Sequence, residues 1–426
     1  MMAKTLYICY FGVREPLVQT QVVPYLRELR NGGFDGGGNE EIRVSLLTFE
    51  PAESIEKGGF DEIRTKLAAE GISWHWLKYH KRPSVPATAL DIIAGARCVR
   101  NLLRRERFDV LHARVHIPML MAALARKYSA HKPKLLFDIR GFFPEEYTDA
   151  GIWPEDGWLY RSAKRVESWL MREADGFVVL TEKAREILFP ESKETGFVSD
   201  GRPVEVIPCC VDISRFAGGI SKEASREKLG SWKRFVIAYV GSFGGWYMTD
   251  EMMELFEAAR EFHRDAFVLV LTQRDKEKIA DELKKRGFGP GDMLVESVSP
   301  SEIPAYLGAA DAAVSLIKAC YSKLSSSPTK IAEYLACGVP IIANRGVGDV
   351  DRLIESNRVG SILEDLSRES YLKALQVIKD LGDVSSRCRE TARREFDLEK
   401  VGGERYRRLY TKLLDQDRNT LQDTPL

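Results

Sequence analysis

The sequence lacks long hydrophobic runs and an excess of charge of either sign. No apolar stretch reaches the roughly 18 residues that a helix needs to cross a bilayer, so we expect a soluble or at most a peripheral protein. The 63 basic and 63 acidic residues balance, which gives the chain no general attraction to nucleic acid. We therefore expect no nucleic acid among its partners.

Cysteine is scarce, and its positions argue against a cysteine-based metal centre or a disulfide framework. The seven residues are odd in number, scattered and mostly set among apolar neighbours, without paired metal-ligand spacing. This pattern predicts reduced, buried thiols and a cytoplasmic location, with the inner face of the membrane as an alternative site. The cysteines are Cys9, Cys98, Cys209, Cys210, Cys320, Cys337 and Cys388.

Length and hydrophobic content predict two globular domains of about 200 residues each. Both halves of the chain run in the order strand, loop and helix, which is typical of a doubly wound domain. Residues 5–11 are predicted to form the first strand rather than a signal peptide, because no basic flank or cleavage site accompanies them. The predicted fold class is α/β: two Rossmann-like doubly wound domains that face each other across a cleft, with a C-terminal helix crossing back to the N-terminal domain. The predicted limits are 1–214, 215–396, a helix at 397–414 and a flexible tail at 415–426.

Two surface segments stand out in the first half. Asn31 to Asn39 contains five glycines and is predicted to be a flexible loop. Arg97 to Arg107 carries five arginines on a predicted helix. A solvated helix face is the simpler interpretation of these arginines, and contact with an anionic membrane surface is the alternative.

The segment from Ser325 to Ala343 is the most informative in the chain. It predicts a loop, a short helix, a Gly-Val-Pro turn and a buried strand. Pro328 suits the first position of the helix, with Ser327 as its cap. Lys330 and Glu333 are three residues apart and share one face, either as a surface pair worth about 0.2–0.5 kcal/mol or as functional groups. A polar helix start beside a strand is a ready site for an anion.

A Gly-rich turn follows the first strand of the second half. The apolar run from Phe235 to Val240 precedes Gly241-Ser242-Phe243-Gly244-Gly245, and Thr249 is predicted to cap the next helix. In the first half, Asp138 and Arg140 follow the strand Leu135 to Phe137, at the edge where open α/β sheets bind ligands. The pair is interpreted either as functional or as a structural ion pair, and the roles of His112 and His116 stay open.

Taken in order, these motifs resemble one family. Gly241-Ser242-Phe243-Gly244, followed by Ser327-Pro328-Thr329-Lys330-x-x-Glu333-Tyr334-x-Ala336-x-Gly338-x-Pro340, is similar to the carboxyl half of the GT-B glycosyltransferases of group 1, the retaining family 4. Phe137 to Phe142, Val179-Leu180-Thr181 and Gly348-Asp349-Val350-Asp351 resemble the same family in order and spacing. The resemblance covers nearly the whole chain.

The resemblance implies a metal-independent transferase without a cofactor. Its donor would be a nucleoside-diphosphate sugar, and its acceptor a glycan, a lipid-linked saccharide or another glycoconjugate precursor. Lys330 would neutralise the leaving diphosphate, and Glu333 would accept hydrogen bonds from the ribose. The implied catalytic residues are Lys330, Arg140 and Asp138, and the implied donor-binding residues are Gly241, Ser242, Arg274, Ser326, Ser327, Thr329 and Glu333.

The chain departs from the family pattern at three places. Ser325 stands where the family has a sugar-contacting glutamate, and Arg140 replaces a histidine near the acceptor. Trp246 and Tyr247 follow the Gly-rich turn in place of an arginine and a lysine, so Lys330, Arg274 or Lys318 would supply that charge. The alternatives to a transferase are a nucleotide-sugar epimerase of the same architecture and a catalytically lapsed nucleotide-sugar-binding subunit.

Overall fold

The chain consists of two compact units. The computed structural model describes residues 3–31, 42–216, 221–230 and 233–422, without the side chains of 416–422. Unit 1 comprises Met1–Pro208 and Leu398–Leu426, and unit 2 comprises Cys209–Asp397. The units therefore divide after Pro208, whereas we predicted a division after residue 214. The predicted glycine-rich loop lies, beyond Asn31, outside the described residues.

Unit 1 is built on a seven-stranded sheet in the order β3-β2-β1-β4-β5-β6-β7, and its strands pair in parallel. The order reverses between β1 and β4, which makes the sheet doubly wound, as predicted. Its strands are short apolar runs, because helices cover both faces of a parallel sheet. The strands are β1 (Lys4–Ile8), β2 (Arg43–Glu50), β3 (Ile72–Lys78), β4 (Val110–Arg114), β5 (Lys134–Asp138), β6 (Gly176–Val179) and β7 (Val204–Val206).

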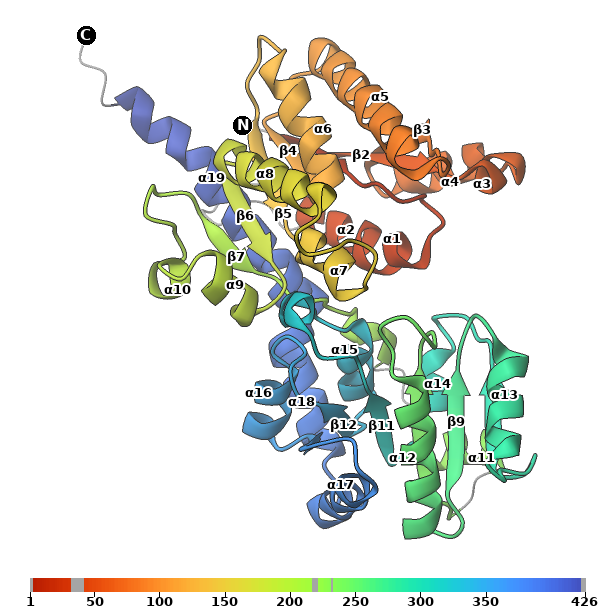
Figure 1. Cartoon of the computed structure of the whole chain (residues 1–426). Helices are drawn as coiled ribbons and strands as arrows, with labels where there is room; N and C mark the ends of the chain where they lie inside the picture. Colours follow the sequence, from red (N-terminus) through yellow and green to blue (C-terminus); the bar gives the residue numbers. More distant parts are fainter. Residues whose placement is uncertain (1–2, 32–41, 217–220, 231–232, 423–426) are drawn as a thin grey trace. The chain divides into compact units, whose positions relative to one another are not determined.

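The helices of unit 1 are sorted onto two faces by the handedness of the crossovers. The connections β3–β4, β4–β5 and β5–β6 step in one direction along the sheet, so right-handed crossovers place α5, α6 and α8 on one face (Figure 1). Helix α6 packs against both α5 and α8. The helices are α1 (Pro16–Gln21), α2 (Val23–Asn31), α3 (Ala52–Glu56), α4 (Phe60–Ala69), α5 (Ser84–Arg105), α6 (His116–Lys127), α7 (Phe143–Asp149), α8 (Trp158–Glu173), α9 (Glu182–Leu188) and α10 (Ser192–Thr195).

Unit 2 repeats this architecture on a six-stranded parallel sheet in the order β10-β9-β8-β11-β12-β13. The order reverses between β8 and β11. The strands are β8 (Val236–Val240), β9 (Phe267–Leu271), β10 (Met293–Glu296), β11 (Ala312–Ser315), β12 (Ile341–Asn344) and β13 (Gly360–Leu363). The helices are η1 (Ile213–Phe216), α11 (Lys222–Leu229), α12 (Thr249–Phe262), α13 (Lys276–Lys285), α14 (Ile303–Leu307), η2 (Tyr321–Ser325), α15 (Thr329–Ala336), α16 (Val350–Asn357), α17 (Arg368–Leu381) and α18 (Ser385–Phe396).

The end of the chain returns to unit 1 through a π-helical turn, Leu398–Gly403, and the helix α19 (Glu404–Gln422). The Tyr410 hydroxyl lies 2.8 Å from Thr5 Oγ1 and 3.0 Å from Nδ1 of His112. These contacts fix α19 on the unit 1 sheet. Residues 415–422 continue α19, so the prediction of a flexible tail is wrong there, and residues 423–426 lie outside the described residues.

The starts of α9 and α12 differ in how they are capped. Thr181, which ends the motif Val179-Leu180-Thr181, caps α9, because its side chain accepts a hydrogen bond from the Ala184 N–H at 3.0 Å. Thr249, predicted as the cap of α12, is instead the first residue of that helix, and Met248 occupies the cap position. None of the helices in the described part of the chain is long and apolar enough to cross a membrane.

A fully buried carboxylate, Asp138, joins β5 to the C-terminal helix. Arg140 Nε lies 2.8 Å from Asp138 Oδ1, and Tyr406 donates a hydrogen bond of 3.1 Å to Asp138 Oδ2. His112 and Arg114 approach Oδ2 to 3.5 and 3.9 Å. Burial alone would raise the pKa of Asp138, but Arg140, His112 and Arg114 hold it well below its usual value. Asp138 is therefore ionised, and its contacts join β5 and the loop after it to β4 and α19.

We expect Asp138→Ala to destabilise the protein by about 3–5 kcal/mol, because it leaves Arg140 and Arg114 without their buried anion. Urea unfolding followed by circular dichroism at pH 7 measures the change. Asp200→Ala is the control, since Asp200 pairs with Arg202 at the exposed surface of the same unit and should cost less than about 1 kcal/mol. Equal losses in the two variants would contradict the assignment.

Candidate functional site

The strands β8 and β11 separate at the point where the sheet order of unit 2 reverses. They pair only at Ala312 with Ile237 and at Ala313 with Ala238. Beyond this, the buried Tyr334 hydroxyl accepts a hydrogen bond from Val240 N–H at 2.9 Å and donates one to Val314 O at 3.2 Å. One side chain of α15 thus satisfies the backbone groups that the separating strands leave unpaired.

Because Tyr334 is held there, α15 begins at the carboxyl edge of the sheet. Its predicted start is wrong by one position: the helix begins at Thr329, and Pro328 is the extended residue before it. Ser327 does not cap the helix, because its hydroxyl accepts a hydrogen bond from the Cys209 N–H at 3.0 Å. The Ser327 hydroxyl, which we expected to cap α15, is thus bound to the first residue of unit 2.

Lys330 is a buried ammonium enclosed by aromatic rings. Its Nζ donates to the Tyr239 hydroxyl at 3.0 Å. It also lies 4.2 Å from the centre of the Tyr239 ring and 4.0 Å from that of Tyr247. Burial lowers the pKa of Lys330 to about 7, and nearby Glu333 opposes this only in part. The lysine is therefore poised to gain a full charge when an anion arrives.

Gly241 lies close to the ammonium of Lys330. Its φ of +136° belongs to the region that favours glycine. A Cβ built on Gly241 would lie 3.0 Å from Lys330 Nζ. The predicted importance of this glycine therefore has two physical reasons, backbone conformation and the proximity of the lysine.

The loop between β8 and α12 crosses the reversal point. Tyr247 forms an isolated bridge with Ile317, and the Lys318 N–H donates to Trp246 O at 2.8 Å. Thr249 Oγ1 accepts a hydrogen bond from the Gly244 N–H at 3.0 Å. The Thr249 side chain therefore closes the Gly-rich loop, whereas we expected it to cap the helix that follows. Trp246 and Tyr247, where the sequence departs from the family pattern, are held over the site.

A second buried lysine was missed from the sequence. Lys323 on η2 lies with its Nζ 4.0 Å from the centre of the Trp246 ring. Ser325, at the position of the family glutamate, is buried and donates a hydrogen bond to Ser322 O at 2.7 Å. The burial of Lys323 is not visible in the sequence, and its place in a Ser-rich segment shortly before Lys330 was only a weak signal.

The other predicted donor-binding residues lie around the same edge. Glu333 is half-buried on α15, and burial raises its pKa while Arg215 and Lys330 lower it. Arg274 is exposed, three residues beyond the end of β9, which is the neighbour of β8 in the sheet. The remaining residues, Ser242, Ser326 and Thr329, flank the Gly241 turn and the start of α15.

Asp138 and Arg140 lie together in unit 1, whereas the donor-binding candidates lie in unit 2. The Arg140 side chain is 6% exposed and also donates to the Tyr406 hydroxyl at 2.7 Å. This burial favours the structural interpretation of the pair, and their catalytic assignment stays a prediction. His116 is buried too, with Nε2 2.9 Å from Glu167 Oε1.

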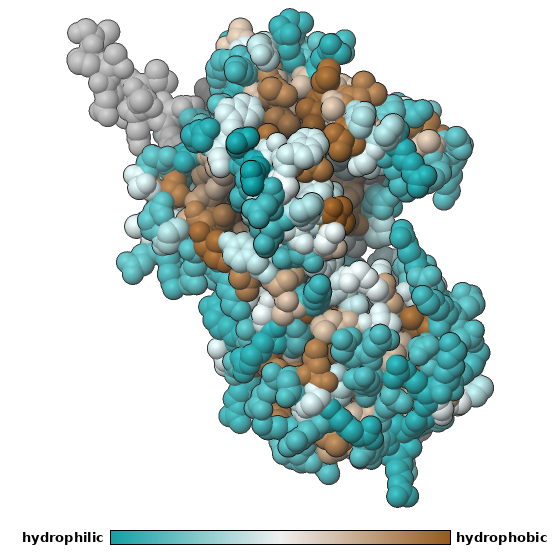
Figure 2. Space-filling view, viewed as in Figure 1, coloured by the Kyte–Doolittle hydropathy of each residue, from teal (hydrophilic) through white to brown (hydrophobic). Residues whose placement is uncertain are grey.

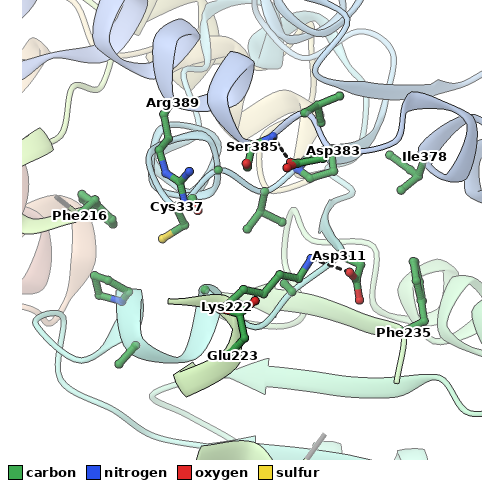
Figure 3. Close-up of a pocket in the computed structure, with 18 of the residues that line it drawn as sticks. Phe216, Lys222, Glu223, Phe235, Asp311, Cys337, Ile378, Asp383, Ser385 and Arg389 are labelled. Atoms are coloured by element: carbon green, nitrogen blue, oxygen red, sulfur yellow. Dashed lines mark hydrogen bonds and ion pairs between the residues drawn. The ribbon is translucent and has the colours of Figure 1, made fainter. Parts of the chain in front are cut away.

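A cavity of about 650 Å³ lies at the opposite, amino edge of the unit 2 sheet (Figure 3). Phe235, Asp311 and Pro340, which directly precede β8, β11 and β12, line it. Two of its carboxylates already have partners, since Lys222 donates to Asp311 at 2.7 Å and the Asp383 carboxylate accepts from Ser385 N–H at 2.9 Å. No residue predicted for the donor site lines this cavity.

The geometry of the carboxyl edge is suited to anions. It combines a helix start, a Gly-rich turn and two buried lysines beside the reversal point, where open α/β sheets bind ligands. Within the described ranges, no cluster of three or more His, Cys, Asp or Glu side chains could hold a metal ion.

Comparison with known structures gives the same fold. A glycosyltransferase from Rickettsia africae has 14% identity and a TM-score of 0.64 over 99% of this chain and 100% of that one. Anabaena HepE in complex with UDP and glucose has 14% identity and a TM-score of 0.61 over 99% and 100%. Sucrose-phosphate synthase from Thermosynechococcus elongatus has 12% identity and a TM-score of 0.68 over 99% and 100%. No curated protein matches in sequence.

Sequence models of two families match successive parts of the chain. Residues 25–209 match the glycosyl transferase 4-like domain, and residues 221–395 match the glycosyl transferases group 1. The two matches together span most of the chain and correspond to units 1 and 2. On these two matches, and with two doubly wound parallel sheets, the chain belongs to the group 1 glycosyltransferases of the GT-B fold.

Proposed function

We propose that the protein transfers a sugar from a nucleoside-diphosphate sugar to a carbohydrate or lipid-linked acceptor, with retention of the anomeric configuration. The observation that carries the proposal is Lys330, a buried ammonium between two tyrosine rings, aimed at the Gly241 turn. HepE, which shares the fold, was solved with UDP and with UDP-glucose, which supports a nucleotide-sugar donor. The reaction would take place in the cytoplasm or at the inner face of the membrane.

In this proposal Lys330 stabilises the charge that develops on the leaving diphosphate. A cation in a site shielded from water stabilises such charge far more than one in water. Backbone N–H groups at Gly241 and Ser242 would approach the phosphates, and Glu333 would accept hydrogen bonds from the ribose. No metal ion is required by this arrangement, because the lysine supplies the positive charge. Attack on the same face as the leaving phosphate would then give retention.

A panel of UDP-, GDP- and ADP-sugars tests the proposal directly. We expect release of nucleoside diphosphate that depends on an acceptor and is unaffected by a chelator, and NMR of the product should show a retained configuration. An inverted product would contradict the retaining mechanism. Epimerisation without acceptor would identify an epimerase, which the same architecture could support, and binding without turnover would identify a lapsed subunit, which Ser325 makes plausible.

We expect Lys330→Met to reduce turnover at least 100-fold, in the range of a lost charge-stabilising group. The same change should raise the free energy of unfolding at pH 7 by roughly 1–3 kcal/mol, because a pKa unit corresponds to about 1.4 kcal/mol and part of this is offset by lost cation–π contacts. The folded-state pKa of about 7 lies below the ordinary value of 10.5, so the wild-type protein gains stability as pH rises between these values.

The stability advantage of Lys330→Met should therefore shrink toward pH 10.5, as unfolding curves at several pH values will show. Lys278→Met is the control, since Lys278 is exposed on α13 and should affect neither turnover nor stability. A Lys330→Met protein that is less stable than wild type at pH 7 would rule out the charged-burial argument.

Donor binding should be linked to protonation of Lys330. At pH 8 the free lysine is largely neutral, and a bound diphosphate favours its charged form, so binding should take up close to one proton. At pH 6 the lysine is already charged and no uptake is expected. Calorimetric titration with the nucleoside diphosphate that binds, in buffers of different ionisation enthalpy, measures the uptake. Buffer-independent heats at pH 8 would count against this role of Lys330.

A further inference from the structure

One face of unit 1 combines exposed apolar side chains with arginines. It is formed by α5, α6 and α8, and is called here the α5–α6–α8 face (Figure 1). In the space-filling view, apolar side chains gather over α5 and α6 among hydrophilic ones (Figure 2). Apolar groups exposed together on a protein surface indicate an interaction site.

Helix α5 divides along its length into an apolar half and a basic half. Val85, Leu90 and Ile93 are 58%, 51% and 48% exposed in its first half. The spacing from Leu90 and Ile93 to Arg97, and on to Arg104, keeps these residues on one stripe of the helix. The one acidic residue within α5, Asp91, is buried on the opposite side.

Helix α6 contributes an apolar stripe between its two neighbours. Ile117, Leu120 and Leu124 follow helical spacing and are each partly exposed. Tyr128, directly after the helix, is 62% exposed. The centre of the face is therefore apolar from one end of α6 to the other.

Helix α8 closes the face with an exposed aromatic residue and further arginines. Trp158 at its start is 72% exposed, and Arg161 and Arg165 are exposed on the same side. The acidic residues of α8 are engaged elsewhere: Glu167 with His116 and Lys164, and Glu173 with Arg126.

Three outer arginines of this face lack partners among the described residues, whereas Arg161 lies 3.8 Å from Asp156. In the part of the chain that the structure describes, Arg97, Arg104 and Arg165 form no ion pair or hydrogen bond. The whole chain has equal numbers of basic and acidic residues, so unpaired cations around an apolar centre are a local feature. This charge calls for an anionic partner that also accepts apolar side chains.

We propose that the α5–α6–α8 face docks on a membrane surface rich in anionic lipids. Its apolar residues would enter the boundary between headgroups and acyl chains, and its arginines would remain at the phosphate level. Trp158 is the residue type that prefers this interface. The inference does not depend on the transferase reaction.

Two other partners fit less well. A second copy of the same face would bring arginine rows against one another, and like charges repel. Single-stranded nucleic acid would match the arginines, but the apolar stripe of Ile117, Leu120 and Leu124 would lie against a polyanion and gain little. Both partners are outcomes of the test.

The test is sedimentation of the full chain with vesicles of phosphatidylcholine, with and without phosphatidylglycerol. We expect binding only when phosphatidylglycerol is present, and weaker binding at high salt. The combined changes Arg97→Gln, Arg104→Gln and Arg165→Gln should weaken binding about 100-fold, since each basic residue at an anionic surface contributes a factor of about five. A charge-matched control replaces Arg264, Lys278 and Arg393, exposed in unit 2, with glutamine and should bind as the wild type does.

Quenching of tryptophan fluorescence by brominated lipid locates the contact. We expect quenching in the wild type that Trp158→Phe largely removes, with an unchanged melting curve. The proposal is overturned if phosphatidylglycerol vesicles do not bind, if the two glutamine variants weaken binding equally, or if quenching persists in Trp158→Phe. Two further outcomes would also overturn it. The wild type would bind RNA or associate with itself but not bind vesicles, and the arginine changes would abolish that binding or association.

Discussion

The hydroxyl of Tyr334 is the interaction on which the site in unit 2 depends. Where a doubly wound sheet reverses direction, two neighbouring strands separate and expose backbone groups that need partners. Tyr334 satisfies Val240 and Val314 with one oxygen, and so ties α15 to both strands. Lys330 lies one helical turn before Tyr334 on the same side of the helix. The position of the Lys330 ammonium therefore follows from the two hydrogen bonds by which Tyr334 joins α15 to the separated strands.

The two units treat buried charge in opposite ways. In unit 1, Asp138 is buried with two arginine partners, Arg140 and Arg114, so its charge is compensated within the fold. In unit 2, Lys330 is buried against aromatic rings, and Glu333 compensates it only in part. A compensated charge holds structural elements together, whereas an uncompensated one stores a preference for an anion from outside. By this difference, Asp138 has a structural role in unit 1, whereas Lys330 is suited to bind an anion in unit 2.

Sequence patterns predicted the two doubly wound sheets because apolar runs, helical periodicity and turns recur in the same order in both halves. The strand predicted from Phe235 to Val240 agrees with β8 to within one residue, since composition is a local property. The cap at Ser327 was predicted wrongly because Cys209, distant in sequence, takes its hydroxyl. The partners of Lys330, and the burial of Asp138 and Lys323, could not be predicted, since they depend on which strands lie side by side.

The close approach of Gly241 to Lys330 has a consequence for how such a protein can diversify. A side chain at 241 would displace the lysine and also meet an unfavourable φ, so this position is closed to variation. Gly244 and Gly245 have open space around the site of a Cβ, but their φ of +75° and +62° is also a conformation that other residues rarely adopt. Trp246 and Tyr247 are instead held through backbone contacts. The backbone therefore restricts all three glycines, and variation along this loop is left to Trp246 and Tyr247, whose backbone contacts do not depend on the side chain.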